Sequence, residues 1–329
     1  MNASRISELL SAFENKRVLV VGDLMLDEYV WGAVSRISPE APVMVIEVNG
    51  DSDFRPGGAA NVVHNVQTLG AIAGLVGVVG DDSHGRRLKQ QLTDAGVDVN
   101  GVVIDRSRPT TRKTRIIAHN QQVVRVDREK VQDVSTAIAR KMMARLEEQI
   151  PQCDAVLFSD YNKGAITSEL VGEAISISRN HGRVVTSNPK PMSILKFKGA
   201  TVVTLNQSEA QAAVQRKLEN EDQVRDAGLT LVEYLSADAV IITRGAHGLC
   251  VCERNGKTSL IPAMPIEVYD VAGAGDTVIS ALTLALTAGA DFVEAATIAN
   301  WAGAAAVTKV GVAAVTRDEI AQVAKRLAP

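Results

Sequence analysis

Short apolar runs that alternate with helical patterns constrain the fold of this chain most. Runs rich in Val and Ile occupy residues 17–22, 74–80, 155–159, 183–186, 200–205 and 239–243. Apolar residues with helical spacing occupy residues 59–69, 85–95, 135–149, 168–180, 208–217 and 222–235. Continuous apolar strands separated by helices are typical of a mostly parallel sheet that is covered on both faces. The sequence therefore predicts an α/β fold with ligands at the carboxyl ends of the strands.

Two segments depart from this alternation. Residues 30–48 and 110–126 contain β-branched residues with interspersed polar ones and show no helical period. This pattern favours strands with one solvated face. We therefore expect a single domain over residues 1–329, with one large α/β core and a small β-sheet lid formed by these two insertions.

Composition excludes several classes of partner. The net charge of −3 argues against a general surface for nucleic acid or membranes. No uncharged apolar run reaches the roughly 20 residues that span a bilayer, and the amphipathic N-terminus is unlike a signal peptide. The three cysteines form no disulfide framework. We expect a cytoplasmic protein whose phosphate sites, if any, depend on local Lys and Arg residues.

The segment from Val271 to Thr277, VAGAGDT, carries the strongest chemical signal. It opens an apolar run that predicts a buried helix, and backbone amides at a helix start attract anions. Gly273 and Gly275 allow a ligand to approach the main chain. Asp276 would lie beside such an anion, where it can accept a proton from an attacking hydroxyl. The alternative is a Gly-rich turn in which Asp276 caps the helix.

This segment resembles the signature of the ribokinase-like sugar kinases, the PfkB family, and three further motifs match in the family's order. They are Gly57-Gly58-Ala59-Ala60-Asn61, Asn206-Gln207-Ser208-Glu209 and Thr243-Arg244-Gly245-Ala246-His247-Gly248. The stretch from Gly22 to Val43 resembles the D-glycero-β-D-manno-heptose 7-phosphate kinases of lipopolysaccharide core biosynthesis. The resemblance implies a three-layer α/β/α core with a mostly parallel sheet and a β-sheet lid over the sugar. Neither a Walker motif nor a G-x-G-x-x-G dinucleotide motif occurs, which disfavours those classes.

The resemblance assigns roles at the proposed catalytic turn. Asp276 would deprotonate the sugar hydroxyl, while the amides of Ala274, Gly275 and Asp276, next to Gly273, stabilise the transferring phosphoryl group. Many relatives bind a monovalent cation such as K⁺ near the residue equivalent to Asp270. Here Val271 and Ala272 replace a pair of threonines, so main-chain carbonyls would have to supply ligands.

On the nucleotide side, the resemblance places ATP and Mg²⁺. Mg²⁺ would be held through water by Glu209, whose spacing from Asn206 also fits a helix capping box. Asn188 and Lys190 would lie near the phosphates, although Asn-Pro also favours a plain turn. The residues assigned to ATP are Asn188, Lys190, Asn206, Glu209, Thr243, Gly245, Gly248 and Asn300. A solvated position on a helix is the alternative for Asn300.

On the sugar side, the resemblance assigns hydroxyl binding to Asp27, which follows the first strand, and to the helix start at Gly57, Gly58 and Asn61. Asp160 ends a strand that faces the same cleft. A phosphate at the far end of the sugar would need cations, because the net charge offers no general attraction. The candidates are Arg36, Lys113, Arg115, Arg125 and Lys163, and the alternative is that these are solvated charges.

The resemblance implies ATP-dependent phosphorylation of D-glycero-β-D-manno-heptose 7-phosphate at its anomeric O1, which gives the 1,7-bisphosphate. The alternatives are another sugar kinase of the ribokinase or phosphofructokinase type, or a non-catalytic sugar or nucleotide sensor. Lid sheets of relatives often pair across a dimer, because an exposed sheet edge invites pairing, so we expect a homodimer. The sequence has no H-x-G-H nucleotidyltransferase motif, so we expect a separate phosphatase and adenylyltransferase.

Overall fold

The computed structural model describes residues 1–119, 121–309 and 311–326. Its central sheet is parallel except for the two hairpin pairings of β12. In spatial order its strands are β13 (Thr258–Ile261), β12 (Leu249–Glu253), β11 (Ala239–Thr243), β10 (Val202–Asn206), β9 (Val184–Asn188), β8 (Ala155–Ser159), β1 (Arg17–Ile37), β4 (Ile72–Val79) and β5 (Val102–Ile104). The mostly parallel sheet that the apolar runs predict is confirmed.

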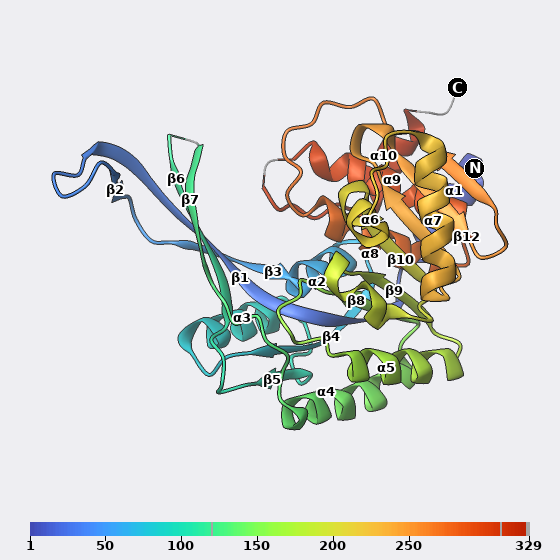
Figure 1. The fold of residues 1–329 in the computed structure, drawn as a ribbon, viewed down its shortest axis with the longest axis horizontal. Coiled ribbons are helices and arrows are strands. Elements are labelled where there is room, and N and C mark those ends of the chain that lie inside the picture. The colour runs from blue at the N-terminus through green and yellow to red at the C-terminus, as the bar shows by residue number, and fades with distance from the viewer. Residues whose placement is uncertain (120, 310, 327–329) are drawn as a thin grey trace.

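Helices cover both faces of this sheet (Figure 1). One face packs against α1 (Ala3–Ser11), α2 (Ala59–Thr68), α3 (Ser83–Asp94), α8 (Ala274–Thr287), α9 (Phe292–Val307) and α10 (Arg317–Lys325). The other face packs against α4 (Thr136–Gln149), α5 (Ser168–Asn180), α6 (Gln207–Val214) and α7 (Glu221–Leu235). Short 3₁₀ turns lie at Ile150–Gln152, Pro191–Phe197 and Gly245–His247. This is the three-layer core that the sequence predicts.

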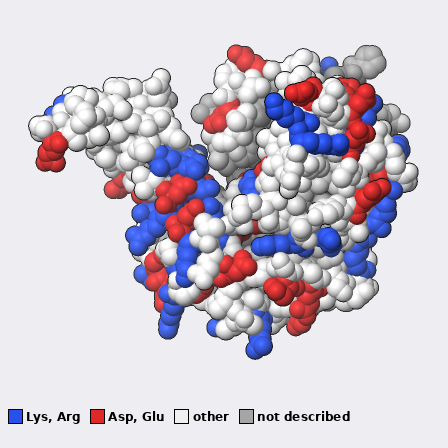
Figure 2. Space-filling model, in the orientation of Figure 1, with Lys and Arg blue, Asp and Glu red and all other residues white. Residues whose placement is uncertain are grey.

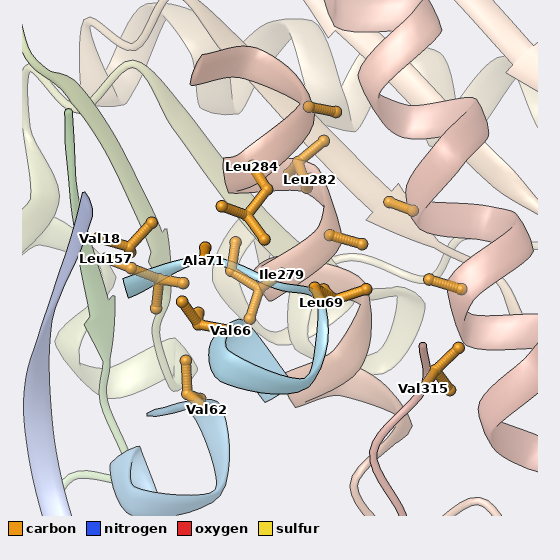
Figure 3. Packing of buried hydrophobic residues seen from close by; sticks show 14 of the residues in the cluster. Val18, Val62, Val66, Leu69, Ala71, Leu157, Ile279, Leu282, Leu284 and Val315 are labelled. Carbon is orange, nitrogen blue, oxygen red and sulfur yellow. The ribbon is translucent and has the colours of Figure 1, made fainter. Parts of the chain in front are cut away.

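The two cores follow from the two-residue period of the strands. Val18 and Val20 of β1 face the cluster under α2 and α8, whereas Leu19 and Val21 face the cluster under α4 and α5. Successive side chains of a strand point to opposite faces, so every central strand contributes to both cores. Figure 3 shows the first cluster, in which Leu157 of β8 lies among side chains from the α2 and α8 regions.

β1 differs from its prediction. The sequence indicates a strand that ends at Gly22, but β1 continues to Ile37 and leaves the core. Its first part pairs with β4 and β8, and its outer part pairs with β3 (Asp53–Gly58), β6 (Thr111–Ala118) and β2 (Met44–Val48). Beyond the core, β2, β3 and β6 pair with the backbone N–H and C=O groups of β1, so the strand can continue past the core boundary without unpaired backbone groups. Asp27 therefore lies within β1 and does not follow it.

The outer part of β1 forms the lid together with β2, β3, β6 and β7 (Gln121–Arg128). The lid projects from the core on the left of Figure 1. It contains both predicted segments, 30–48 and 110–126, apart from residue 120, which lies outside the described residues. β3 belongs to it as well, and sequence reasoning missed this strand. No helix within the described residues has the length and apolar character needed to cross a membrane.

Candidate active site

Polar residues gather at the carboxyl ends of the central strands, as the sequence predicts. Asp160 follows β8, and Asn188, Asn206 and Thr243 are the last residues of β9, β10 and β11. The start of α8 lies against the same edge, and together these elements enclose a cavity of about 160 Å³. Its lining consists of Tyr161, Asn188, Lys190, Thr204, Asn206, Glu209, Thr243, Gly273, Gly275, Asp276 and Val278.

Asp276 lies in the first turn of α8 and is 7% exposed. Both of its carboxylate oxygens accept hydrogen bonds: Asn61 Nδ2 donates to Oδ2 at 2.6 Å and Tyr161 OH donates to Oδ1 at 2.9 Å. Burial raises the pKa of Asp276 to about 6, against the lowering effects of these two donors and of Lys190. A carboxyl group with this pKa is ionised at neutral pH and can still accept a proton, as a general base requires.

The turn before Asp276 brings main chain to the cavity. Gly273 adopts φ 77°, and a Cβ there would lie 3.0 Å from Val312 Cγ1, so the position favours glycine. Gly273 and Gly275 both line the cavity. The Ala274 amide, which the resemblance assigns to the phosphoryl group, donates to the Val271 carbonyl at 3.3 Å instead. In this arrangement the amides of Gly275 and Asp276 are the better candidates for an anion.

The Asn206 and Glu209 side chains form the capping box that is one of the two sequence interpretations. Asn206 Oδ1 accepts from the Glu209 amide at 2.8 Å, and Glu209 Oε2 accepts from the Asn206 amide at 2.9 Å. The other oxygen, Oε1, accepts from Lys190 Nζ at 2.8 Å. Asn188 Nδ2 donates to the Thr204 side chain and carbonyl. Glu209 thus caps the helix and also lines the cavity.

A second cavity, of about 740 Å³, adjoins the first and has a largely apolar lining. Asn206, Thr243 and Gly275 line both cavities. Gly245, Gly248 and Asn300 line only the larger one, together with apolar residues from the segment 263–271 and from α9. Asn300 Nδ2 donates to the Pro262 carbonyl at 2.8 Å. The eight residues assigned to ATP therefore lie around two adjoining cavities.

The sugar-side motifs meet where β1 enters the lid. Asp27 is opposite Arg55, and a Cβ on Gly57 would lie 2.4 Å from Asp27 Oδ2. Gly58, with φ 59°, precedes α2, and Asn61 in that helix contacts Asp276. Asp27 Oδ1 is taken by Arg115 Nη1 at 2.6 Å. The two sugar motifs are thus adjacent, and Asn61 joins them to the candidate base.

The five cations proposed for a distal phosphate do not form one cluster of unpaired charges. Four are paired with carboxylates, in the pairs Arg36–Glu47, Arg115–Asp27, Arg125–Asp127 and Lys163–Glu129. Lys113 forms no ion pair within the described part of the chain; its ammonium lies 5.6 Å from the Tyr161 ring centroid. Burial lowers the pKa of Lys113.

Arg36 is also distant from the other four cations. Lys113 is paired with Asp27 in the lid sheet, and Arg36 lies nine residues further along β1, which is roughly 30 Å of extended strand. In Figure 2, basic and acidic side chains lie side by side at the base of the lid, whereas its far end is mostly uncharged. Long-range strand register decides this separation, and the sequence carries no direct signal of it.

Sequence reasoning missed several residues of the site, among them Tyr161 and Asp23. Tyr161 donates to Asp276, although the sequence marks it only as the neighbour of Asp160. Asp23, 2% exposed, accepts backbone amides from Tyr161, Lys163 and Ala165 and so shapes the loop after β8. Burial raises the pKa of Asp23. The available signal was an Asp directly after the apolar run 17–22, because a carboxylate at the edge of a core needs several donors.

Asp160 and Asp270 have different surroundings. Asp160 is 2% exposed; its Oδ1 accepts from the Asn162 amide, and its Oδ2 has no hydrogen-bond partner within the described residues. Asp270 accepts from the amides of Ala272 and Gly311 and joins those two loops. Among the described residues no group of three or more His, Cys, Asp or Glu side chains could hold a metal ion.

Comparison with known proteins gives a consistent assignment. Residues 15–319 match the profile of the pfkB family carbohydrate kinases. The chain is 43% identical over 311 residues to the bifunctional protein HldE of Desulfatibacillum aliphaticivorans, covering 94% of this chain and 63% of that protein. It is 41% identical to HldE of Geotalea uraniireducens, covering 97% and 65%. The chain thus spans just under two thirds of the length of these relatives.

Solved structures share the fold at low sequence identity. Phosphofructokinase-2 from Escherichia coli in complex with potassium superposes with a TM-score of 0.75 at 20% identity, covering 95% of this chain and 99% of that one. Arabidopsis thaliana ribokinase complexed with ribose and ATP gives 0.74 at 18% identity, covering 94% and 99%. The ribokinase-like fold is confirmed. With the family match over residues 15–319, it follows that this chain is an ATP-dependent carbohydrate kinase that belongs to the pfkB family.

Proposed function

We propose that this kinase transfers the γ-phosphoryl group of ATP to the anomeric O1 of D-glycero-β-D-manno-heptose 7-phosphate and forms the 1,7-bisphosphate. The buried carboxylate of Asp276 carries the reaction class, because it lies between the sugar-side motifs and the cavity lined by Lys190 and Asn206. Support for the sugar comes from the stretch from Gly22 to Val43, which resembles heptose 7-phosphate kinases, and from the similarity to HldE proteins over most of the chain.

Asp276 acts as the general base in this proposal. One of its carboxylate oxygens takes the proton from O1, and O1 attacks the γ-phosphorus while the bond to the β-phosphate oxygen breaks and ADP leaves. An anomeric hydroxyl is more acidic than an ordinary alcohol, so a carboxylate is an adequate base. The amides of Gly275 and Asp276 at the start of α8 would stabilise negative charge on the phosphoryl group.

The two cavities suit the two ends of ATP. The apolar cavity of about 740 Å³, with Asn300 and the glycines Gly245 and Gly248, is within the usual size for a nucleoside site. The smaller cavity holds Lys190, Asn188 and Asn206 for the phosphates. Lys190 would act as a point charge toward the phosphates. For this, its ammonium must contact a phosphate beside Glu209 or leave the ion pair with Glu209.

The donor set fits Mg²⁺ held mostly through water. Glu209 contributes one carboxylate to the cavity wall, which is sufficient because Mg²⁺ keeps several waters. Bound Mg²⁺ supplies charge neutralisation of the phosphates. The oxygens of Asp270, like those of Glu209, already accept one hydrogen bond each. For K⁺, main-chain carbonyls would have to complete the site beside Asp270.

Lys113 is the residue that we propose for the distal phosphate, because it alone among the five candidates lacks a carboxylate partner within the described residues. Lys163 is next, provided that Glu129 releases it. Asp27, Gly57, Gly58 and Asp160 would bind sugar hydroxyls, and Asp160 Oδ2, which has no hydrogen-bond partner among the residues that the structure describes, can accept one of them.

The proposal is tested by measuring ADP release with heptose 7-phosphate, unphosphorylated heptose, fructose 6-phosphate and ribose. We expect kcat/KM to be highest for heptose 7-phosphate. Replacement Lys113→Ala should raise the KM for that substrate about tenfold, equivalent to about 1.4 kcal/mol, with little change in the KM for ATP. Arg36→Ala is the matched control and should leave both constants unchanged.

A higher kcat/KM for ribose or fructose 6-phosphate would replace the proposed substrate by one of those sugars. No ADP release with any sugar, together with ATP binding, would favour a sensor. An unchanged KM in Lys113→Ala would remove Lys113 from the phosphate site.

We also propose that the chain forms a homodimer through its lid. Several apolar side chains of the lid are exposed, namely Trp31, Ile37, Val43, Met44, Val48, Val124 and Val126, and a solvated patch of this kind is typical of an interaction surface.

The product would pass to a phosphatase and then to an adenylyltransferase. The similarity to proteins named bifunctional HldE supports a close connection with a second activity.

A further inference from the structure

Tyr161 lies where the lid, the nucleotide side and the candidate base meet. Its hydroxyl donates to Asp276 Oδ1 at 2.9 Å. Its ring centroid lies 5.6 Å from Lys113 Nζ of β6 and 5.4 Å from Lys190 Nζ, which follows β9. The Tyr161 side chain therefore contacts the proposed base and lies near two lysine ammonium groups. In the proposed reaction, Lys113 binds the sugar phosphate and Lys190 binds ATP.

The backbone around Tyr161 is held independently of its side chain. The buried carboxylate of Asp23 accepts the amides of Tyr161, Lys163 and Ala165 at 2.9, 3.0 and 3.1 Å. Asn162 adopts a left-handed conformation with φ 56°, which closes the turn between β8 and the rest of the loop. A loop tied at three amides places the Tyr161 side chain with little freedom, as a preorganised site requires.

Asp276 needs a donor on each oxygen for its orientation. Asn61 Nδ2 donates to Oδ2 at 2.6 Å, and Asn65 Nδ2 donates to Asn61 Oδ1 at 3.4 Å, so the Asn61 side chain is itself oriented. Without the Tyr161 hydroxyl, Oδ1 would keep no protein donor among the described residues, and the carboxylate could rotate about its remaining bond. A carboxylate that attacks one particular proton loses rate when its orientation is lost.

We propose that Tyr161 is a positioning residue for the phosphoryl transfer described above: its hydroxyl orients Asp276, and its ring anchors Lys113 of the lid beside the base. The Lys113 ammonium reaches the Tyr161 ring from the lid strand β6. The same side chain, Tyr161, therefore positions both the proposed phosphate-binding cation and the proposed base. Ring faces attract ammonium groups, and burial strengthens this attraction.

The electrostatic conditions agree with this role. Burial and the neighbouring Asp276 raise the pKa of Tyr161 well above its usual range, so the phenol remains a neutral donor when Asp276 is ionised. The hydrogen bond from Tyr161 favours the ionised carboxylate and lowers the pKa of Asp276, whereas burial raises it. Loss of the hydroxyl should therefore move the pKa of Asp276 upward.

The alternative is that Tyr161 only fills space. Two variants separate the possibilities. Tyr161→Phe keeps the ring and loses the hydroxyl, and Tyr161→Leu loses both. Tyr234→Phe is the matched control, because Tyr234 is 56% exposed and its ring lies beside Lys198, away from Asp276.

We expect Tyr161→Phe to lower kcat about tenfold, to leave the KM for the sugar phosphate within about twofold, and to shift the acid limb of the pH profile of kcat/KM to higher pH. Tyr161→Leu should add a rise of about fivefold or more in the KM for the sugar phosphate, because Lys113 loses its anchor. A Tyr161→Phe enzyme with the wild-type kcat and pH profile would overturn the positioning role, and an unchanged KM in Tyr161→Leu would remove the anchoring of Lys113.

This inference rests on the proposed function, and a titration that needs no substrate separates their failures. The carboxyl pKa of Asp276 can be followed by carbon NMR in the free, ¹³C-labelled protein, with Asp276→Asn to assign the signal. We expect a higher pKa in Tyr161→Phe than in the wild type and no change in Tyr234→Phe. If heptose 7-phosphate is not phosphorylated, the proposed substrate is wrong, yet an upward shift would still support the role of Tyr161. An unshifted pKa would contradict that role whatever the substrate.

Discussion

The pKa of the Asp276 carboxyl group is raised to about 6 because the group is buried. The raised pKa makes the carboxylate a stronger base, but it also makes the ionised form costly for folding. The ionised form, which the proposed chemistry needs, is the form that burial disfavours. The folded state therefore holds the proton more tightly than the unfolded chain, whose value is near 3.8. As the pH rises between these two values, ionisation of Asp276 reduces the free energy of unfolding.

Activity should follow the ionisation of Asp276. The base must be deprotonated, so kcat/KM should rise with pH through about 6 and level off above it. The measurement is a pH profile of kcat/KM at saturating ATP, with a coupling system whose own rate is checked at each pH. An acid limb near pH 4 would show that Asp276 is not the titrating base or that substrate binding offsets its burial.

Asp276→Asn should separate chemistry from stability. An amide cannot take the proton, so we expect kcat to fall by about 10²–10⁴. The amide carries no charge and can donate to the Tyr161 oxygen, so at pH 8 the free energy of unfolding should rise by about 1–3 kcal/mol. This gain should become small near pH 4, where the folded wild type is protonated and the unfolded chain is about half ionised, and it should vanish below about pH 3, where both states are protonated.

Denaturant unfolding at both pH values, beside kinetics, checks this prediction. Asp51→Asn, a change at an exposed loop position, is the control and should alter neither quantity. Near wild-type kcat in Asp276→Asn would remove Asp276 from the mechanism, and equal destabilisation at both pH values would mean that the hydrogen bonds outweigh the burial of charge.

Among the helices, α6 combines a structural task with the proposed Mg²⁺-binding role of Glu209 in its first turn. The capping box of Asn206 and Glu209 satisfies two amides that a helix start leaves unpaired. The same Glu209 faces the cavity and pairs with Lys190. α10 repeats this arrangement away from the site, where Glu319 forms a capping box with Thr316 and an ion pair with Lys309 at 2.7 Å.

Glu209→Gln should raise the Mg²⁺ concentration needed for half-maximal activity, by about fivefold or more, with a small change in melting temperature. Gln preserves the acceptor for the Asn206 amide, yet it lacks the charge that attracts hydrated Mg²⁺ and pairs with Lys190. Glu319→Gln removes the same kind of interaction elsewhere and should leave the Mg²⁺ titration unchanged. If Glu209→Gln lowers only the melting temperature, its role is that of a helix cap.

For the molecule as a whole, β1 is the element that joins the core to the lid. Its first half is buried between β4 and β8, and its outer half carries the lid strands, so the lid is continuous with the central sheet. Asp27 lies at the transition and holds Arg115 of β6 at 2.6 Å. Movement of the lid would therefore act directly on the proposed sugar site.

The proposed dimer makes a prediction at this level. Val124 and Val126 share one face of β7 and are 44% and 54% exposed. Val124→Lys with Val126→Lys should convert the homodimer into a monomer in light scattering, because two ammonium groups would have to be desolvated at the interface. Val131→Lys, at a position that is 60% exposed and outside the lid strands, is the control. A monomeric wild type would contradict the dimer itself.

Features that depend on neighbouring residues followed from the sequence. The apolar runs predict the central strands and the end of β11 at Thr243, because period and turn residues are local properties. The same holds for the capping-box spacing of Asn206 and Glu209 and for the glycine-rich start of α8. β9 and β10 extend beyond the predicted runs 183–186 and 200–205 and end at Asn188 and Asn206. The predicted helix 208–217 ends earlier, at Val214, because Gln215 adopts a left-handed conformation with φ 53°.

Features that join distant segments were decided by the tertiary structure. Asn61 and Tyr161 lie 215 and 115 residues from Asp276 in the chain, and they meet its carboxylate only because α2, the loop after β8 and α8 converge at one edge of the sheet. Likewise the register of β6 on β1 places Arg115 against Asp27, 88 residues away, and leaves Lys113 beside Tyr161. A residue's type sets which interactions it can form, whereas long-range packing selects its partner. That selection determines both the pKa of the proposed base and which cation remains available for the proposed substrate.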